Sequence, residues 1–205
     1  ELLSILASGI GSLSNPSRLS NTFKSEKHKS ISSEAIKTYL TYFEEAYLIN
    51  EAKRYDVKGK KYIDTPLKYF FTDMGLRNSW LNFRQLEENH IMENIIYNEL
   101  VIRGYSVDVG VVEYQYRDSE KKKTKVQLEV DFIARNAGDT FYIQSAMNVD
   151  TDEKREQETN SLKRIKDSFK KIVIVRDHIM PYKDENGILF IGIKDFLLEE
   201  DSLRK

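Results

Sequence analysis

Residues 48–64 read LINEAKRYDVKGKKYID, two strand-like runs separated by a turn that contains Gly59. Apolar and aromatic residues around a glycine-containing turn are typical of a β-hairpin. Three helix-like stretches precede it, near residues 2–10, 16–23 and 33–47, and Pro16 suits the first turn of the second. Three short helices followed by a hairpin predict a winged helix-turn-helix domain over residues 1–76.

The third helix has a clear start and an apolar stripe. Ser32 or Ser33 is the expected N-cap, after a polar connection at residues 24–29. The apolar residues then recur every three or four positions, which is typical of a helix with one face in the core. They are Ile36, Leu40, Phe43 and Tyr47. Core packing is also the expectation for the tyrosines in regular stretches, namely Tyr39, Tyr42, Tyr47, Tyr69 and Tyr97.

The second half alternates helices and strands. A helix is predicted at 90–104, strands at 106–114, 126–134 and 140–147, a helix at 152–169, strands at 172–175 and 188–193, and a short helix near 196–198. Residues 117–125 form a charged loop whose lysines, Lys121, Lys122 and Lys123, are expected at a solvated hairpin tip. Residues 77–205 are therefore predicted to form a mixed α/β domain, and the whole chain belongs to the α+β class.

Composition excludes several classes of protein. The 205 residues hold 32 Lys and Arg against 33 Asp and Glu, so no global basic excess points to nucleic acid. No apolar run approaches the roughly 20 residues that cross a bilayer, so no membrane partner is expected. Cysteine is absent, which excludes disulfides and thiolate zinc sites. His28, His90 and His178 are scattered, and a cytoplasmic location is expected.

The chain begins at Glu1 with helix-like periodicity and contains no phosphate loop of the G-x-x-x-x-G-K-[ST] type. We therefore expect it to be a fragment of a longer protein, and we expect no ATP binding by this motif within it.

Several strings carry a family resemblance. They are RYDVKGKKY at 54–62, KYFFTDMGLRN at 68–78, HIMEN at 90–94, NEL at 98–100, EVDFIA at 129–134, YIQ at 142–144 and KRE at 154–156. In this order the chain resembles the C-terminal region of archaeal and bacterial AAA-type ATPases, a region treated as a domain of unknown function. The resemblance implies an upstream ATPase module in the same polypeptide. ATP would bind only there, leaving this chain with no cofactor of its own by default.

The same resemblance implies that the second half is similar to the PD-(D/E)XK restriction-endonuclease fold. Matched by position, the catalytic residues would be Glu93, Asp131 and Gln144, and Glu93 with Asp131 would hold Mg²⁺ or Mn²⁺. The lysine that should follow two positions after Gln144 is replaced by Ala146. That lysine stabilises developing negative charge, so its loss indicates a degenerate site.

Two further residues bear on this site. Glu99 is a rival for the helix carboxylate, because sequence does not fix the helix register. His90 lies three residues before Glu93, on the same helical face, as a His–Glu metal pair would require. An ordinary histidine at the start of a helix is the alternative interpretation.

A basic patch is the main indication of nucleic-acid binding. The third helix could enter a DNA groove while the hairpin lies against phosphates. The candidate contact residues are Lys37, Lys53, Arg54, Lys58, Lys60 and Lys61. Residues 1–76 hold eleven basic and nine acidic residues, and Glu34, Glu44 and Glu45 make the third helix a poor face for a polyanion.

The sequence therefore predicts a non-catalytic module that binds double-stranded DNA or a protein partner, attached to an AAA-type ATPase. One alternative is a Mg²⁺- or Mn²⁺-dependent DNA nuclease using Glu93, Asp131 and Gln144. Another is a protein-interaction or oligomerisation module. Whether this chain is an enzyme is left open.

Overall fold

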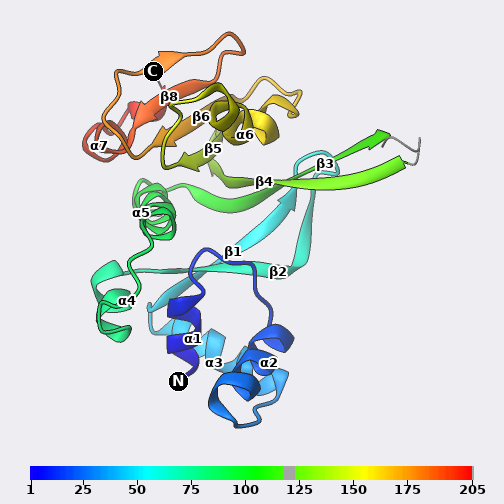
Figure 1. Ribbon diagram of the computed structural model, residues 1–205, viewed down its shortest axis with the longest axis vertical. Coiled ribbons are helices and arrows are strands. Elements are labelled where there is room, and N and C mark those ends of the chain that lie inside the picture. The colour runs from blue at the N-terminus through cyan, green and yellow to red at the C-terminus, as the bar shows by residue number, and fades with distance from the viewer. Residues whose placement is uncertain (118–122, 205) are drawn as a thin grey trace. The chain divides into compact units, whose positions relative to one another are not determined.

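The computed structural model describes residues 1–117 and 123–204, without the side chains of residues 117 and 123. The predicted loop residues Lys121 and Lys122, and the side chain of Lys123, lie outside this described part. Within it the fold is mixed α/β, with seven α-helices and one mixed sheet of eight strands (Figure 1). By its internal contacts the chain divides into two compact units: Glu1–Lys53 with Asp64–Asn98, and Arg54–Ile63 with Glu99–Lys205. The predicted domains, 1–76 and 77–205, remain a prediction.

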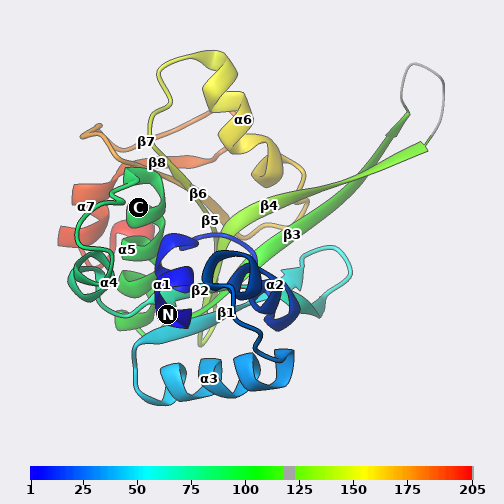
Figure 2. The ribbon, with the colours of Figure 1, turned by 60° about the horizontal axis from the view of Figure 1, so that its bottom comes forward.

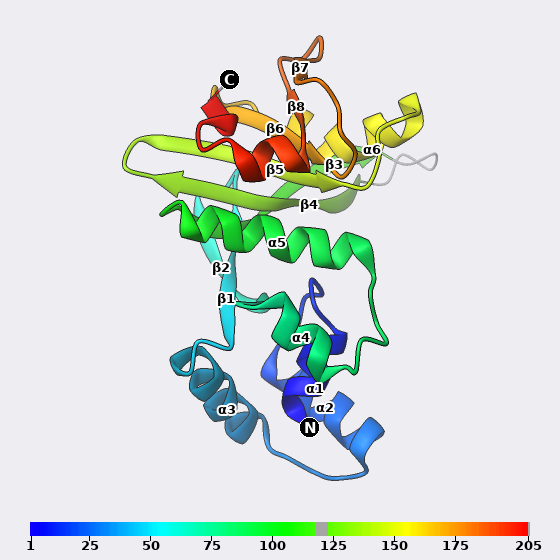
Figure 3. The same cartoon turned by 90° about the vertical axis from the view of Figure 1, so that its left-hand side faces the viewer.

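The first unit is built on helices: α1 (Leu2–Ser8), α2 (Pro16–Lys27), α3 (Ser33–Glu45), α4 (Met74–Trp80) and the start of α5 (Glu88–Ile102). The side chains of Asn15, Ser32 and Asp73 each accept a bond from the backbone N–H three residues on, which begins α2, α3 and α4. Helix α1 packs on α2 and α4, and α2 packs on α3 (Figure 3).

The predicted hairpin is confirmed as β1 (Ile49–Asp56) and β2 (Lys61–Phe71). The ends of both strands that are far from the turn belong to the first unit, where Ile49 and Phe71 are fully buried. They join a core built largely of helical side chains: Leu2, Leu3, Ile5, Leu6, Ile10, Leu19, Phe23, Ile36 and Leu40. Burial of these apolar side chains is the main stabilising contribution in this unit.

Four expectations in the first unit were wrong in detail. Helix α2 continues through the connection predicted to be irregular, to Lys27. Tyr47 follows α3 with a φ of 55° and is 81% exposed, because the helix ends at Glu45 and the apolar stripe ends with it. Tyr39 and Tyr42 are also exposed, on the outer side of α3, whereas Tyr69 and Tyr97 are buried as predicted.

The second unit contains most of the sheet. Its strands are β3 (Ser106–Arg117), β4 (Lys123–Asn136), β5 (Asp139–Ala146), β6 (Lys170–Val175), β7 (Tyr182–Lys183) and β8 (Leu189–Gly192). The order in the described sheet is β2-β1-β3-β4-β5-β6-β8-β7. Strands β3, β4 and β5 are antiparallel neighbours, and β6 is parallel to β5 and β8. Figure 2 shows the long β3–β4 pair.

Helices lie against this sheet: α6 (Asp152–Lys163) packs on β4, β5 and β6, and α7 (Ile193–Leu198) packs on β6 and β8, before a short 3₁₀ helix at Ser202–Arg204. The prediction of a helix through residue 169 was wrong. Helix α6 ends at Lys163, because Ile165 turns into the core and the chain then leads to β6. The connection from Arg164 to Phe169 is therefore irregular, and this matters for the candidate site.

Candidate nucleic-acid interface

The turn of the hairpin is held by a short aspartate side chain. Asp56 Oδ1 accepts bonds from the backbone N–H groups of Lys58, at 3.1 Å, and Gly59, at 2.9 Å. A Cβ atom at Gly59 would clash with Asp56 Oδ2, so a side chain at this position would displace the carboxylate that holds the turn. Lys60 takes a positive φ of 52° to complete the turn. The turn therefore presents Lys58 and Lys60 on either side of Gly59, both exposed.

The part of the hairpin next to the turn is anchored within the second unit. Arg54, Tyr55 and Asp56 pair in parallel with β3, and Val57 N–H donates to the carbonyl of Val111 at 3.0 Å. Arg135 lies over the Tyr55 ring, 4.2 Å from its centroid, and bonds Asp108 at 2.6 Å.

Tyr62 completes this anchor by donating its hydroxyl to Asp108 at 3.2 Å. Burial, and then the nearby Asp108 carboxylate, raise the pKa of Tyr62, which keeps it a donor at neutral pH. The turn is thus attached to a rigid support.

A cavity of about 570 Å³ lies beside this turn, wholly within the second unit. Three segments line it: the turn itself, the middle of β3, and the irregular connection after α6. Its apolar wall consists of Val57, Val112, Tyr114 and Ile165. Its charged residues are Lys58, Lys60, Glu113, Lys163, Arg164, Lys166 and Asp167. Five cations against two carboxylates make this a basic site.

The carboxylates at the cavity are already engaged by other groups. Glu113 lies 3.4 Å from both Lys125 Nζ and Gln127 Nε2 on the neighbouring strand. Asp167 accepts from the Tyr142 hydroxyl at 2.6 Å and from the Phe169 N–H at 3.2 Å.

The cations divide into two groups. Lys163 pairs with Glu156, whereas Lys58, Lys60 and Lys166 form no ion pair with any residue that the structure describes. An anion that enters this site would meet three uncompensated ammonium groups.

The structure separates the predicted nucleic-acid-binding residues. Arg54, Lys58, Lys60 and Lys61 belong to the second unit, whereas Lys37 and Lys53 belong to the first. Sequence reasoning missed the cations that join the hairpin at the cavity, Lys163, Arg164 and Lys166. The signal was present as the run KRIK at 163–166, but it was assigned to a continuing helix. A charged run that directly follows a helix was the available clue.

Glu93, the predicted helix carboxylate, lies in the first unit and forms a buried ion pair. Lys68 Nζ is 2.7 Å from Glu93 Oε1, and the two side chains are only 4% and 12% exposed. Gly11, at a φ of 74°, lies against Glu93 and His90: a Cβ there would be 2.8 Å from His90 Nδ1. These contacts give Glu93 a structural role within the first unit.

Asp131 and Gln144, the other two predicted residues, are neighbours in the second unit. Each adjoins the Phe132–Ile143 pair at the end of the β4–β5 ladder, and Asp131 Oδ2 accepts from the Ser145 N–H at 2.8 Å. Gln144 also lowers the pKa of Glu158 on α6, a carboxylate that sequence reasoning did not identify, although burial outweighs this effect. Ala146, at the expected lysine position, is buried in the core. No group of three or more His, Cys, Asp or Glu in the described part of the chain could hold a metal ion.

Glu158 allows a pH-dependent prediction. Burial raises its pKa above the usual value, and Gln144 offsets this only in part. A raised pKa in the folded state means that stability is greatest below the unfolded-state pKa, about 4.3, and is lost as pH rises through the folded-state value. Glu158→Gln should therefore be more stable than wild type at pH 7, with the difference vanishing near pH 4, as measured by urea unfolding.

Glu153 on the same helix is the matched control. Backbone and Thr151 hydrogen bonds at the helix start lower the pKa of Glu153, which is the opposite direction. Glu153→Gln should reduce stability at pH 7, and this loss should also disappear on acidification. If the stability difference from wild type had the same sign and pH dependence in both variants, the burial of Glu158 would be contradicted.

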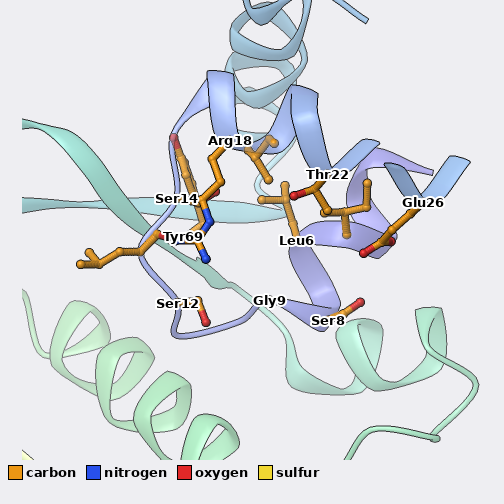
Figure 4. A pocket seen from close by; sticks show the side chains of 12 residues that line it. Leu6, Ser8, Gly9, Ser12, Ser14, Arg18, Thr22, Glu26 and Tyr69 are labelled. Atoms are coloured by element: carbon orange, nitrogen blue, oxygen red, sulfur yellow. Dashed lines mark hydrogen bonds between the residues drawn. The ribbon is translucent and has the colours of Figure 1, made fainter. Parts of the chain in front are cut away.

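The first unit holds a smaller hollow, of about 250 Å³, between α1, α2 and the loop that joins them (Figure 4). Its charged residues, Arg18 and Glu26, have opposite signs, and Arg18 already donates to the Leu13 carbonyl at 3.0 Å. Tyr69 also lines it, and burial raises the pKa of its hydroxyl. This hollow selects no ionic ligand, so the basic cavity of the second unit is the stronger candidate.

Comparison with known proteins finds similarity to a domain of unknown function and to an uncharacterized protein. Residues 1–87 match the family described as Domain of unknown function (DUF8612). The chain is 37% identical over 199 residues to a protein from Haemophilus influenzae named "Uncharacterized protein", covering 97% of this chain and 45% of that protein. The chain thus spans less than half the length of this relative. No solved structure matches the chain.

These findings overturn the resemblance to the C-terminal region of AAA-type ATPases, which was wrong. The matched family is a domain of unknown function and the relative is an uncharacterized protein. Two of the sequence stretches that suggested the resemblance form structural elements. Residues 54–62 form the anchored hairpin, and residues 68–78 form the end of β2 and the Asp73 cap of α4. The prediction of an upstream ATPase module that binds ATP rested on this resemblance and therefore has no remaining support. In the described residues, no helix is both long and apolar enough to cross a membrane.

Proposed function

We propose that this chain is a nucleic-acid-binding module that does not cleave its ligand. The observation that carries the proposal is a group of lysines at one cavity, Lys58 and Lys60 on the anchored hairpin turn and Lys166 on the connection after α6, none of which forms an ion pair within the part of the chain that the structure describes. Lysines fixed near each other on a rigid support attract phosphates, because binding releases counterions from the nucleic acid. A near-neutral chain with such a local patch has its charge concentrated where a ligand would bind.

The finer fold assignment belongs to this proposal. The order of α1, α2, α3, β1 and β2 is that of a winged helix, in which the hairpin is the wing. The helix-flanked mixed sheet of the second unit has an element order compatible with a degenerate restriction-endonuclease-like domain. Buried Ala146 at the lysine position, and Asp131 bonded to a backbone N–H, support a role without catalysis.

Anisotropy of a labelled DNA duplex, titrated with the chain at low and at physiological salt with Mg²⁺ present, tests the proposal. We expect affinity to fall steeply with salt. Replacing Lys58, Lys60 and Lys166 together by alanine should weaken binding about tenfold at physiological salt and lower the salt slope. The matched control replaces Lys154, Lys183 and Lys194, which are exposed in the same unit but do not line the cavity, and should have a much smaller effect.

Two results would overturn the proposal. Absence of binding at both salts would leave a protein partner as the remaining function. Nicking of plasmid DNA that requires Mg²⁺ or Mn²⁺, and that Asp131→Ala abolishes, would replace the non-cleaving module by the nuclease.

A further inference from the structure

The cavity has more apolar surface than phosphate binding requires. Phosphates of a duplex need only the exposed lysines at its rim, yet Val57, Val112, Tyr114 and Ile165 line a space of about 570 Å³. Sites for small organic ligands fall in the range of about 300–1,000 Å³ and combine apolar walls with a few polar groups. This cavity has the size and the lining for an organic group that is attached to an anion.

One wall is a flat, cationic surface. The guanidinium of Arg164 lies over the ring of Tyr114, 3.6 Å from the ring centroid. Arg164 Nε also donates to Asn160 Oδ1 at 2.9 Å, which fixes the plane of the guanidinium. Nucleobases stack on aromatic rings and on arginine planes, and single strands are commonly held in this way.

Other residues that line the cavity supply the charge. Lys58 and Lys60 come from the hairpin turn and Lys166 from the connection after α6, and none of them is paired with a described residue. Of the two carboxylates, Glu113 is paired with Lys125, whereas Asp167 accepts from neutral donors and keeps its charge, so the five cations still outnumber the negative groups at the cavity. The two properties, a stacking surface and free cations, occur together in one cavity of the second unit.

We propose that this cavity holds one unstacked nucleotide of a nucleic-acid strand. The base lies against Arg164, Tyr114 and the valine wall, and its phosphates lie among Lys58, Lys60 and Lys166. This inference rests on the proposed function and refines it: the preferred ligand is a single-stranded segment or a strand end rather than the interior of a duplex. A free nucleotide has the same chemistry, so the test includes it.

The test compares a blunt duplex with the same duplex carrying a single-stranded overhang, by anisotropy at physiological salt. Wild type should bind the overhang about tenfold more tightly, as expected for one stacked base. Tyr114→Ala should reduce this ratio to below about twofold. Tyr116→Ala is the matched control: Tyr116 is on the same strand, 6.2 Å from the Tyr114 ring, does not line the cavity, and should keep the full ratio.

Arg164→Met is a second variant in case Tyr114→Ala does not fold, because Arg164 is exposed and its replacement leaves the hydrophobic core intact. It should also reduce the ratio, whereas Lys154→Met, with the same charge change at an exposed position of α6 away from the cavity, should not.

The outcomes separate the two proposals. Equal binding of blunt and overhanging duplexes by wild type would overturn the inference and leave nucleic-acid binding standing. Absence of binding to either would overturn the proposed function itself. If AMP displaced the overhang at a lower concentration than a short oligonucleotide did, the ligand would be a free nucleotide, and the inference of a nucleotide within a strand would be wrong.

Discussion

Lys68→Met is expected to lower the free energy of unfolding by about 3–5 kcal/mol, the usual loss when one partner of a buried ion pair is removed. Lys68 lies on β2 and Glu93 on α5, and their 2.7 Å contact is almost completely shielded from water. Without the ammonium group, the Glu93 carboxylate would lose a charged partner in a site of low polarity. Urea unfolding monitored by circular dichroism measures the loss.

Two control variants test whether the loss of stability comes from leaving a buried charge without its partner. Lys125→Met breaks the Lys125–Glu113 pair, in which the lysine side chain is 64% exposed, and should change stability by less than about 1 kcal/mol. Combining Lys68→Met with Glu93→Leu removes both charges and should recover about half of the loss or more. A single variant as stable as wild type would contradict the structural role of Glu93 and would restore it as a candidate metal ligand.

Arg103→Met is expected to destabilise the second unit by about 2–4 kcal/mol, because several buried or half-buried acceptors lose a charged donor together. Arg103 bonds Glu99 at 2.7 Å, the Glu200 carbonyl at 3.1 Å and Ser202 Oγ at 3.0 Å, and also donates to the Phe196 carbonyl. Its guanidinium lies over the Phe196 ring as well.

Limited proteolysis is the more specific measurement for Arg103. Four of the groups that it contacts lie in the segment from α7 to the last described residues, so cleavage there should become faster in Arg103→Met. Arg204→Met is the matched control: Arg204 pairs with Asp139 and Asp201 but is 57% exposed, and its loss should have little effect on stability. Equal protection of the C-terminal segment in Arg103→Met and wild type would contradict this anchor.

The elements that sequence predicted well are those with local signals. Two strand-like runs around the Gly59 turn predicted the hairpin, and the Ser32-Ser33 pair predicted the start of α3. Tyr47 was misplaced because the helical period says nothing about where a helix ends. The cavity could not be predicted, because Lys58 and Lys166 meet only once the hairpin has paired with β3 and α6 has packed on the sheet.

The candidate catalytic residues show the same limit more sharply. The family resemblance implied that Glu93 and Asp131 share a metal, but the partner of Glu93 is Lys68, a residue that nothing in the sequence singles out as buried. A lysine in a strand is expected to be exposed unless its carboxylate partner is known. The family assignment failed for a related reason, because sequence stretches that are required by the fold were interpreted as evidence for a particular family.

The division of the hairpin has a consequence for how this chain can be cut or rearranged. The polypeptide passes from the first unit to the second within β1, returns within β2, and crosses again within α5. A fragment that stops before β3 would carry the Tyr55 side of the hairpin with no strand beside it, and an unpaired edge of this kind favours aggregation. Gene fusions, truncations and recombination events should therefore preserve residues 54–63 together with 106–117, since these two stretches are distant in sequence but pair within one structural unit.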